Sequence, residues 1–242
     1  PAGVLMIDDC WCRAYGDWEF DASRFPSPKG MVDELHRMGF KVMLWCCPFV
    51  SPDTVIFRSL ESNGALVKTE KGDTALCHWW NGYSAVLDLS CPQARDWFYA
   101  QTDRLMREYG IDGFKLDAAD PEYYPKGSVF SDGSQRSFQA SAWAEMGAKF
   151  AFNELRVGFN SGGLPVANRL RDKNHSWMDD GLNTLVPDGI AMGLCGYPFL
   201  CPDMIGGGMV PDFHREGFCF DGELFVRYCQ IAAFFPMMQF SR

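Results

Sequence analysis

The sequence predicts an α/β protein built as an incomplete (β/α)8 barrel. Short apolar runs alternate with amphipathic helical segments, which is typical of parallel sheets. Carboxylates follow at least three of these runs, and the active site of a barrel lies at the C-terminal ends of its strands. A doubly wound sheet fits the alternation nearly as well, but no glycine-rich phosphate turn follows the first run. We therefore expect one barrel domain over residues 1–242, without its first strand and the end of its last.

The first third of the chain shows the alternation clearly. Pro28 suits the first turn of a helix and Gly39 ends it. A long connection inside a compact domain is more often functional than a spacer, so the irregular stretch that follows is expected to be a loop insertion. The expected elements are a strand at 3–7, a helix at 28–38, a strand at 41–45, and the insertion at 51–84 with a small helix near 54–62.

The rest of the chain continues the pattern. Ser90 can cap a helix that ends before Gly110, and a strand follows whose last residue is Asp117. The expected elements are a helix at 92–109, a strand at 113–117, a helix at 137–155, a short strand at 157–159, a helix at 182–193, an apolar run at 199–200, a helix at 223–234 and a strand starting at 237–240.

Composition excludes several classes of protein. The chain is 47% hydrophobic and 15% aromatic, which rules out disorder as its main state. Its net charge of −9 comes without any basic stripe, so nucleic acid is not an expected partner. No apolar run reaches the roughly 18 residues of a membrane helix. The abrupt apolar stretches at both ends, without an initiator Met, indicate a piece of a longer chain.

The ten cysteines do not form a disulfide or zinc pattern. The chain is neither short nor loop-rich, it has no CxxC, and its four histidines follow no ligand spacing. Cys46 and Cys47 lie in an apolar run, where buried free thiols are expected. The cysteines thus favour a reducing, cytoplasmic type of compartment.

Acidic residues at strand ends carry the candidate chemistry. Asp8, Asp9, Asp117, Asp172 and Asp203 stand out. A carboxylate at a barrel mouth can attack an electrophilic carbon or bind a metal, although Asp117 could equally form a structural ion pair with Lys115, two residues along the same strand face. Paired carboxylates are what glycoside hydrolysis requires.

Tryptophans accompany these carboxylates. Aromatic faces pack against sugar rings, and five of the eight tryptophans lie at or just beyond expected strand ends. Each alone is more often a core residue, but the set indicates a carbohydrate site. The five are Trp11, Trp45, Trp79, Trp80 and Trp177.

The motifs of the chain resemble those of glycoside hydrolase family 31, in the right order over essentially the whole length. The segment Gly113-Phe114-Lys115-Leu116-Asp117 resembles the nucleophile strand of that family. Further segments that resemble the family lie at 7–11, 16–21, 24–36, 39–49, 118–120, 193–199 and 202–207. The family contains α-glucosidases, α-xylosidases and some α-galactosidases, so the resemblance implies a TIM barrel, a carbohydrate substrate, and no metal or organic cofactor.

The resemblance assigns the catalytic pair. Asp117 takes the place of the nucleophile, and Asp172 that of the acid/base, because the family has an Asp followed five residues later by Trp, here Trp177. The usual Trp-x-Gly before that Asp is absent. An alternative aligns Trp177-Met178-Asp179-Asp180 with the family's Trp-x-Gly-Asp, but it leaves the following helix one to two turns short.

The resemblance also implies the substrate-binding residues. Asp8 and Asp9 match the acidic pair that binds sugar hydroxyls, and Trp80 matches a tryptophan of subsite −1. Lys115 is expected to bind a hydroxyl and to help keep Asp117 ionised. The remaining expected members of this set are Trp45, Arg169 and Asp203.

The preferred sugar is inferred from departures within the family. Ser241 falls where α-glucosidases have a substrate-binding His. With the Asp-Asp pair and Lys115, this favours an α-galactoside over an α-glucoside or α-xyloside. Two alternatives stay open: a member that only binds glycans or proteins, and a metal-dependent barrel enzyme using Lys115, Asp117, Asp8 and Asp203.

Overall fold

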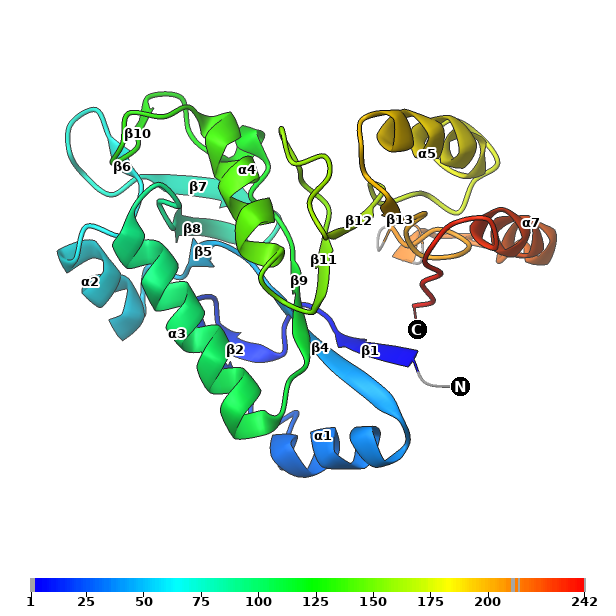
Figure 1. Cartoon of the computed structure of the whole chain (residues 1–242), viewed down its shortest axis with the longest axis horizontal. Helices are drawn as coiled ribbons and strands as arrows, with labels where there is room; N and C mark the ends of the chain where they lie inside the picture. Colours follow the sequence, from blue (N-terminus) through cyan, green and yellow to red (C-terminus); the bar gives the residue numbers. More distant parts are fainter. Residues whose placement is uncertain (1–2, 210–211, 213, 242) are drawn as a thin grey trace. The chain divides into compact units, whose positions relative to one another are not determined.

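The computed structural model describes residues 3–209, 212 and 214–241, which fall into two compact units (Figure 1). Unit 1 runs to Asn153 and includes Val157–Asn160. Unit 2 comprises Glu154–Arg156 and the chain from Ser161 onward.

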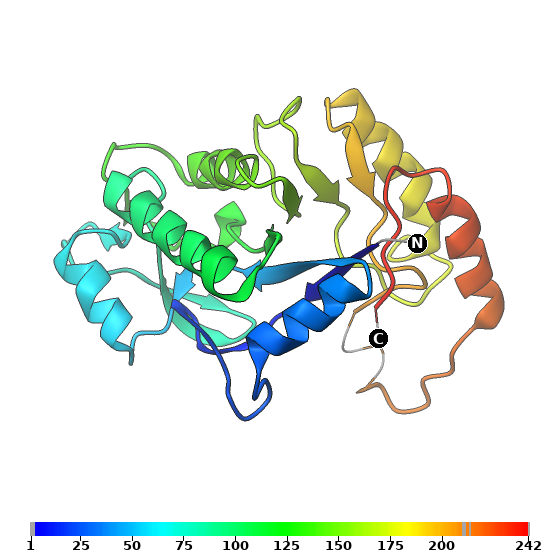
Figure 2. The same ribbon diagram turned by 60° about the horizontal axis from the view of Figure 1, so that its bottom comes forward.

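Parallel strands form the centre of unit 1. Strand β1 (Gly3–Ile7) pairs with β4 (Phe40–Cys46), and β4 pairs with β9 (Gly113–Leu116), all in parallel. Figure 2 shows β1 and β4 side by side. The apolar run in β4 is buried, as expected of a strand covered on both faces. Because the strands are parallel, the residues that follow β1 and β9 emerge at one edge of the sheet.

A glycine allows the next strand to approach β9. A Cβ atom at Gly113 would lie 1.9 Å from the carbonyl oxygen of Phe152, the first residue of β11 (Phe152–Leu155). No side chain fits there, so the contact requires glycine.

Unit 1 contains four helices, two of which contact the parallel strands directly. Helix α1 begins at a proline and contacts β4 and α3, while α4 contacts β9. Helix α3 also begins at a proline and ends at Gly110, whose φ of 80° places it in the left-handed region. The helices are α1 (Pro28–Arg37), α2 (Val55–Ser62), α3 (Pro92–Tyr109) and α4 (Arg136–Gly147), with a 3-10 turn, η1 (Pro121–Tyr123).

The segment 51–84, expected to be an irregular insertion, contains a helix and several short strands. It contains α2, where a small helix was expected, and two strands of an antiparallel sheet ordered β5-β8-β7. Strands β7 and β8 form a hairpin, and β5 joins it from a more distant part of the sequence. The antiparallel strands of unit 1 are β2 (Cys12–Ala14), β3 (Asp17–Phe20), β5 (Phe49–Val50), β6 (Lys68–Thr69), β7 (Leu76–Trp79), β8 (Gly82–Val86) and β10 (Ser128–Val129).

Unit 2 contains two further parallel pairings. Strand β12 (Ala167–Arg169) pairs with Leu155 at the end of β11 and with β13 (Phe199–Cys201). The 3-10 turn η2 (Leu182–Thr184) leads into α5 (Leu185–Leu194). Helix α7 (Gly222–Ala232) begins after Asp221, whose side chain accepts hydrogen bonds from the N–H groups of residues 223 and 224. An apolar cluster packs α5 and α7 together, and its buried members include Leu185, Leu224 and Tyr228.

Three expected elements of the second half were wrong. The helix expected at 137–155 ends at Gly147, and its last four residues form β11. The structure has no strand at 157–159, and residues 237–240 contribute an isolated bridge between Gln239 and Met204 rather than a strand. The strands at 3–7, 41–45 and 113–117 and the helices at 28–38, 92–109 and 223–234 are confirmed, within about two residues at each end.

All ten cysteines carry free thiols. Within the part of the chain that the structure describes, no helix combines the length and apolar character needed to cross a bilayer.

Candidate active site

Asp117 is held at the carboxyl end of β9 by groups from β4, from α4 and from the backbone that follows it. Its side chain is 7% exposed. Oδ2 accepts a 2.9 Å hydrogen bond from Nε1 of Trp45, at the end of β4, and Oδ1 accepts one of 2.8 Å from the backbone N–H of Ala118. Its main-chain oxygen accepts from Nε1 of Trp143 in α4 at 3.1 Å. N–H donors stabilise a carboxylate anion and fix its orientation.

The backbone immediately after Asp117 is strained. Ala118 and Ala119 have φ values of 58° and 63°, in the left-handed region that side chains other than glycine rarely adopt. Both residues are fully buried. Strain of this kind is typical of functional sites, where the surrounding structure holds it in place.

Asp8 and Lys115 form an ion pair beside Asp117. Nζ of Lys115 lies 2.8 Å from Oδ2 of Asp8, across the sheet from β9 to the end of β1. Lys115 is buried and lies two residues before Asp117 on the same strand, so both side chains leave the same face. Asp8 is thus an ion-pair partner of Lys115 at this edge of the sheet.

Asp9 belongs to a different group of contacts. Its Oδ1 accepts a 3.0 Å hydrogen bond from the Tyr15 hydroxyl, and its Oδ2 accepts from the Asn81 amide at 3.0 Å and from Nε1 of Trp80 at 3.4 Å. Burial, followed by the nearby charge of Asp9, raises the pKa of Tyr15, so this phenol stays protonated and acts as a donor. Asp9 therefore joins the β2–β3 turn to the β7–β8 turn.

The tryptophans at strand ends divide into core and exposed residues. Trp11, Trp45 and Trp79 are each at most 2% exposed, and Nε1 of Trp11 donates to the main-chain oxygen of Trp45 at 2.7 Å. Trp80 is 48% exposed and Trp177 is 43% exposed. Of the five, Trp80 and Trp177 are thus accessible to solvent, while Trp11, Trp45 and Trp79 are buried.

In unit 2, Arg169 gathers three carboxylates around one guanidinium. Its Nη1 lies 2.5 Å from Oδ1 of Asp172 and 3.3 Å from Oδ1 of Asp203, and its Nε lies 3.6 Å from Oε1 of Glu154. Arg169, Asp203 and Glu154 are buried, whereas the Asp172 side chain is 38% exposed. Asp172 is thus the member of this cluster that solvent reaches.

The alternative acid/base residues have other surroundings. Asp179 and Asp180 are exposed and lie in a loop stabilised by amides: Asn183 donates to Asp179 at 2.6 Å, and Asn174 donates to Asp180 at 2.7 Å. The Asn174 hydrogen bond is the main reason that the pKa of Asp180 is lowered. A lowered pKa is the opposite of what a general acid needs.

The sequence prediction missed four residues of these clusters. Glu154 was placed inside an expected helix, and the Phe-Asn-Glu-Leu sequence of 152–155 gives no local signal for the strand that it occupies. Tyr15, Asn81 and Trp143 enter only through contacts with residues far away in the sequence, which no local signal reveals. The predicted residues Asp8, Asp9, Trp45, Trp80, Lys115 and Asp117 lie in unit 1, and Arg169, Asp172 and Asp203 lie in unit 2.

No group of three or more His, Cys, Asp or Glu side chains suited to a metal ion occurs among the described residues.

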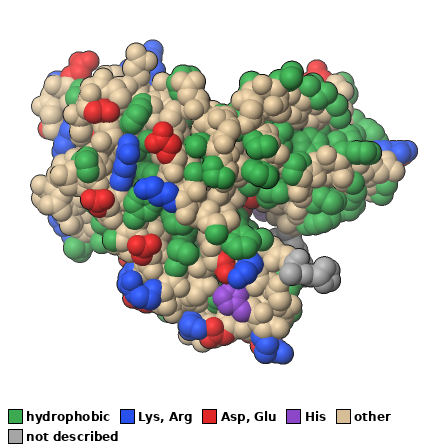
Figure 3. Space-filling view, in the orientation of Figure 1, with side chains coloured by type: hydrophobic (Ala, Val, Ile, Leu, Met, Phe, Trp, Pro, Cys, Tyr) green, Lys and Arg blue, Asp and Glu red, His purple; other side chains and the backbone are tan. Residues whose placement is uncertain are grey.

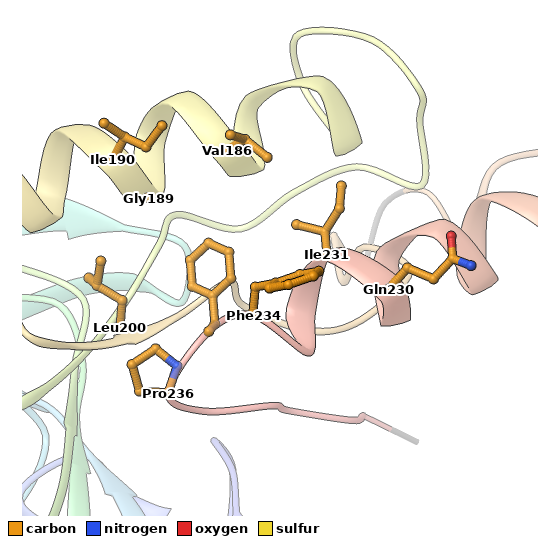
Figure 4. Close-up of a pocket in the computed structure, with 9 residues that line it drawn as sticks. Val186, Gly189, Ile190, Leu200, Gln230, Ile231, Phe234 and Pro236 are labelled. Carbon is orange, nitrogen blue, oxygen red and sulfur yellow. The ribbon is translucent and has the colours of Figure 1, made fainter.

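A separate apolar pocket lies between α5 and α7. It has a volume of about 530 Å³, and Figure 4 shows Val186, Ile190, Ile231 and Phe234 among the side chains that line it. Hydrophobic side chains also gather on the surface over these two helices (Figure 3), and Phe234 is 92% exposed. None of the lining residues is titratable, so the pocket carries no catalytic groups.

Comparison with known proteins supports the resemblance noted in the sequence. Residues 1–241 match the family described as "Glycosyl hydrolases family 31 TIM-barrel domain". The chain is 38% identical to the myogenesis-regulating glycosidase of Mus musculus over 98% of this chain and 34% of that protein. It also resembles the sulfoquinovosidase of Escherichia coli K12, with 24% identity over 94% of this chain and 35% of that protein.

Solved structures show the same fold. A sulfoquinovosidase of E. rectale, solved with an aza-sugar inhibitor, superposes with a TM-score of 0.84 at 20% identity, over 97% of this chain and 38% of that one. An α-xylosidase from a soil metagenome, solved with xylose, gives a TM-score of 0.76 at 27% identity, over 94% of this chain and 35% of that one. The chain thus spans about a third of the length of these relatives.

Proposed function

The chain belongs to glycoside hydrolase family 31, and from this premise we propose that it is the catalytic barrel of a retaining, exo-acting α-glycosidase. The substrate would be a terminal α-linked sugar, with an α-galactoside favoured. The observation that carries the proposal is the buried carboxylate of Asp117, oriented by the N–H groups of Trp45 and Ala118 beside the Lys115–Asp8 pair.

Asp117 is the proposed nucleophile of a double displacement. In the first step a carboxylate oxygen of Asp117 forms a bond to the anomeric carbon, while the bond from that carbon to the leaving oxygen breaks. The leaving oxygen takes a proton from Asp172. The two hydrogen bonds to Asp117 hold its lone pairs in a fixed direction, and this pre-organisation lowers the cost of reaching the transition state.

In the second step Asp172 removes a proton from water, and the water oxygen attacks the anomeric carbon. The bond to Asp117 breaks, the sugar leaves with its original configuration, and both side chains return to their starting states. Asp172 suits the role because it is the solvent-accessible carboxylate of the Arg169 cluster. Arg169 and the buried Asp203 would then position the Asp172 carboxylate. Asp179 or Asp180 is the alternative candidate for the acid/base.

Sugar recognition is assigned to the polar groups of unit 1. The Asp8 carboxylate and the Lys115 ammonium together offer acceptors and donors to neighbouring hydroxyl groups, and the half-exposed ring of Trp80 offers an apolar surface to a sugar. The preference for galactose rests on the Asp8-Asp9 pair, Lys115 and the Ser at position 241. The named relatives act on different sugars, so the preference for galactose is the most specific part of the proposal.

The test uses the intact protein with a panel of aryl α-glycosides: galactoside, glucoside, xyloside and N-acetylgalactosaminide. The product anomer is followed by NMR before mutarotation. Release of one sugar as the α-anomer is expected. A β-anomer as first product would show inversion and remove Asp117 from the nucleophile role. No release from any substrate by folded protein would favour a family member that binds glycans without hydrolysing them.

Asp117→Asn supplies the control for this assay. The amide has nearly the shape of the carboxylate but no nucleophilic charge, so turnover should fall by about 10³-fold or more with the fold unchanged. An unchanged rate would end the assignment.

A further inference from the structure

The β7–β8 turn is short, and it carries an exposed tryptophan. Trp79 pairs with Gly82, which leaves Trp80 and Asn81 as the two turn residues, and Gly82 has a φ of 93°. Trp80 is 48% exposed, although its ring edge contacts Trp79 with a centroid distance of 4.8 Å. Its ring also lies 5.8 Å from that of Tyr123, so ring contacts hold one side of the turn and polar contacts hold the other.

Those contacts converge on Asp9. Within unit 1, Asp9 accepts from both turn residues, 3.0 Å from the Asn81 amide and 3.4 Å from Nε1 of Trp80. Its other oxygen accepts from the Tyr15 hydroxyl, and the Asn81 amide also donates to that hydroxyl. The three side chains therefore form a closed set of hydrogen bonds around one carboxylate.

Tyr15 is itself fixed by the core. Its ring lies 4.6 Å from that of Trp79 and 6.0 Å from that of Trp45, both edge to face. Its backbone exchanges hydrogen bonds with Ser51, and a Cβ atom at the following Gly16 would meet Val50 at 3.0 Å. The Tyr15 hydroxyl is thus a rigid donor that fixes Asp9, and Asp9 fixes the β7–β8 turn.

We propose that Asp9, Tyr15 and Asn81 are positioning residues that fix Trp80 for substrate binding. The adjacent carboxylates of Asp8 and Asp9 then have different roles. Asp8, paired with Lys115, faces the substrate, whereas Asp9 anchors the β7–β8 turn. The effect of this anchoring on substrate binding by Trp80 rests on the proposed function. The anchoring itself can be measured in a protein without activity.

The test combines hydrogen exchange with kinetics on the intact protein. Tyr15→Phe and Asn81→Ala each remove a donor to Asp9, and Tyr83→Phe is the matched control, since that phenol lies on the same hairpin and is 67% exposed. The backbone amides of 77–84 should exchange about tenfold faster in both variants and not in the control. The reason is that each variant loses a hydrogen bond to the charged carboxylate of Asp9, and such a bond stabilises the turn by an amount of that order. Asn81 is exposed, so that variant is expected to fold even if Tyr15→Phe is destabilised.

Kinetics then test the link to Trp80. Each variant should raise KM about tenfold with little change in kcat, because the turn supplies binding rather than chemistry. In a Trp80→Ala background the same substitutions should have no further effect on KM, which general destabilisation would not produce.

The outcomes separate the two proposals. Unchanged exchange at 77–84 overturns the anchoring, whatever the activity. Faster exchange with additive effects on KM overturns the link to Trp80. A wild-type protein that hydrolyses nothing contradicts the proposed function alone, since the exchange experiment still decides the anchoring.

Discussion

Nε1 of Trp45 donates a 2.9 Å hydrogen bond to Oδ2 of Asp117, from one parallel strand to the end of its neighbour. Trp45 pairs in register with Lys115, so the indole, the ammonium and the carboxylate all leave the same face of the sheet. The orientation of the proposed nucleophile is therefore set by β4, the strand next to its own.

Trp45→Phe should lower kcat about tenfold or more, because it removes a donor to a charged group while keeping an aromatic ring in place. Initial rates with the best aryl α-glycoside measure this effect. Trp143→Phe is the control: it makes the same change at an equally buried position, but it removes a donor to the main-chain oxygen of Asp117 rather than to its carboxylate. An equal loss of kcat in both variants would mean that packing, not the hydrogen bond, is responsible.

Asp172→Ala should slow the hydrolysis of substrates with poor leaving groups by about 10²- to 10⁴-fold and spare those with acidic phenols, since only the former need protonation. Asp180→Ala, at an exposed carboxylate with a lowered pKa, should change neither rate. The measurement is the dependence of kcat/KM on leaving-group acidity. If Asp180→Ala steepens this dependence and Asp172→Ala does not, Asp180 rather than Asp172 is the acid/base.

Arg169→Met should destabilise the fold by about 3–5 kcal/mol, because it leaves the buried carboxylates of Glu154 and Asp203 without their shared cation. Urea unfolding at neutral pH gives this difference. Arg171→Met, at an exposed neighbour, should cost less than about 0.5 kcal/mol. A small effect of Arg169→Met would show that other groups balance these charges.

Asp112→Asn should lower stability at pH 7 by about 1 kcal/mol, the order of a partly exposed ion pair. Burial of Asp112 raises its pKa, but Lys41, the Val42 N–H and His36 together outweigh this, and the net pKa lies below its ordinary value of 3.8. The stability that it contributes is thus present above about pH 4 and is lost as pH falls through the lowered pKa. Urea unfolding from pH 7 to pH 2 should show the variant and the wild type converging in acid, with the exposed Asp53→Asn as control. A constant gap would contradict the charge-based explanation.

Local signals predicted much of the fold. Proline at the start of α1 and α3, glycine after their ends, and the apolar runs of β1, β4 and β9 are all encoded within a few residues, and those elements are confirmed. The helix expected through Leu155 failed because 152–155 has no strong local preference. Its strand conformation comes from the close approach at Gly113 and the pairing of Leu155 with Asn168.

The candidate site divides in the same way. The sequence by itself determined the family, the parallel strands, and the carboxylates that follow them, because apolar period and motif spacing are local properties. Only the tertiary structure decided that Asp8 pairs with Lys115 while Asp9 binds Tyr15 and Asn81, that Trp45 faces Asp117, and that Glu154 joins Arg169. The partners in these contacts lie between 6 and 107 positions apart along the chain. Pairing at such separations depends on which strands lie side by side, and side-chain periodicity within a single strand does not contain that information.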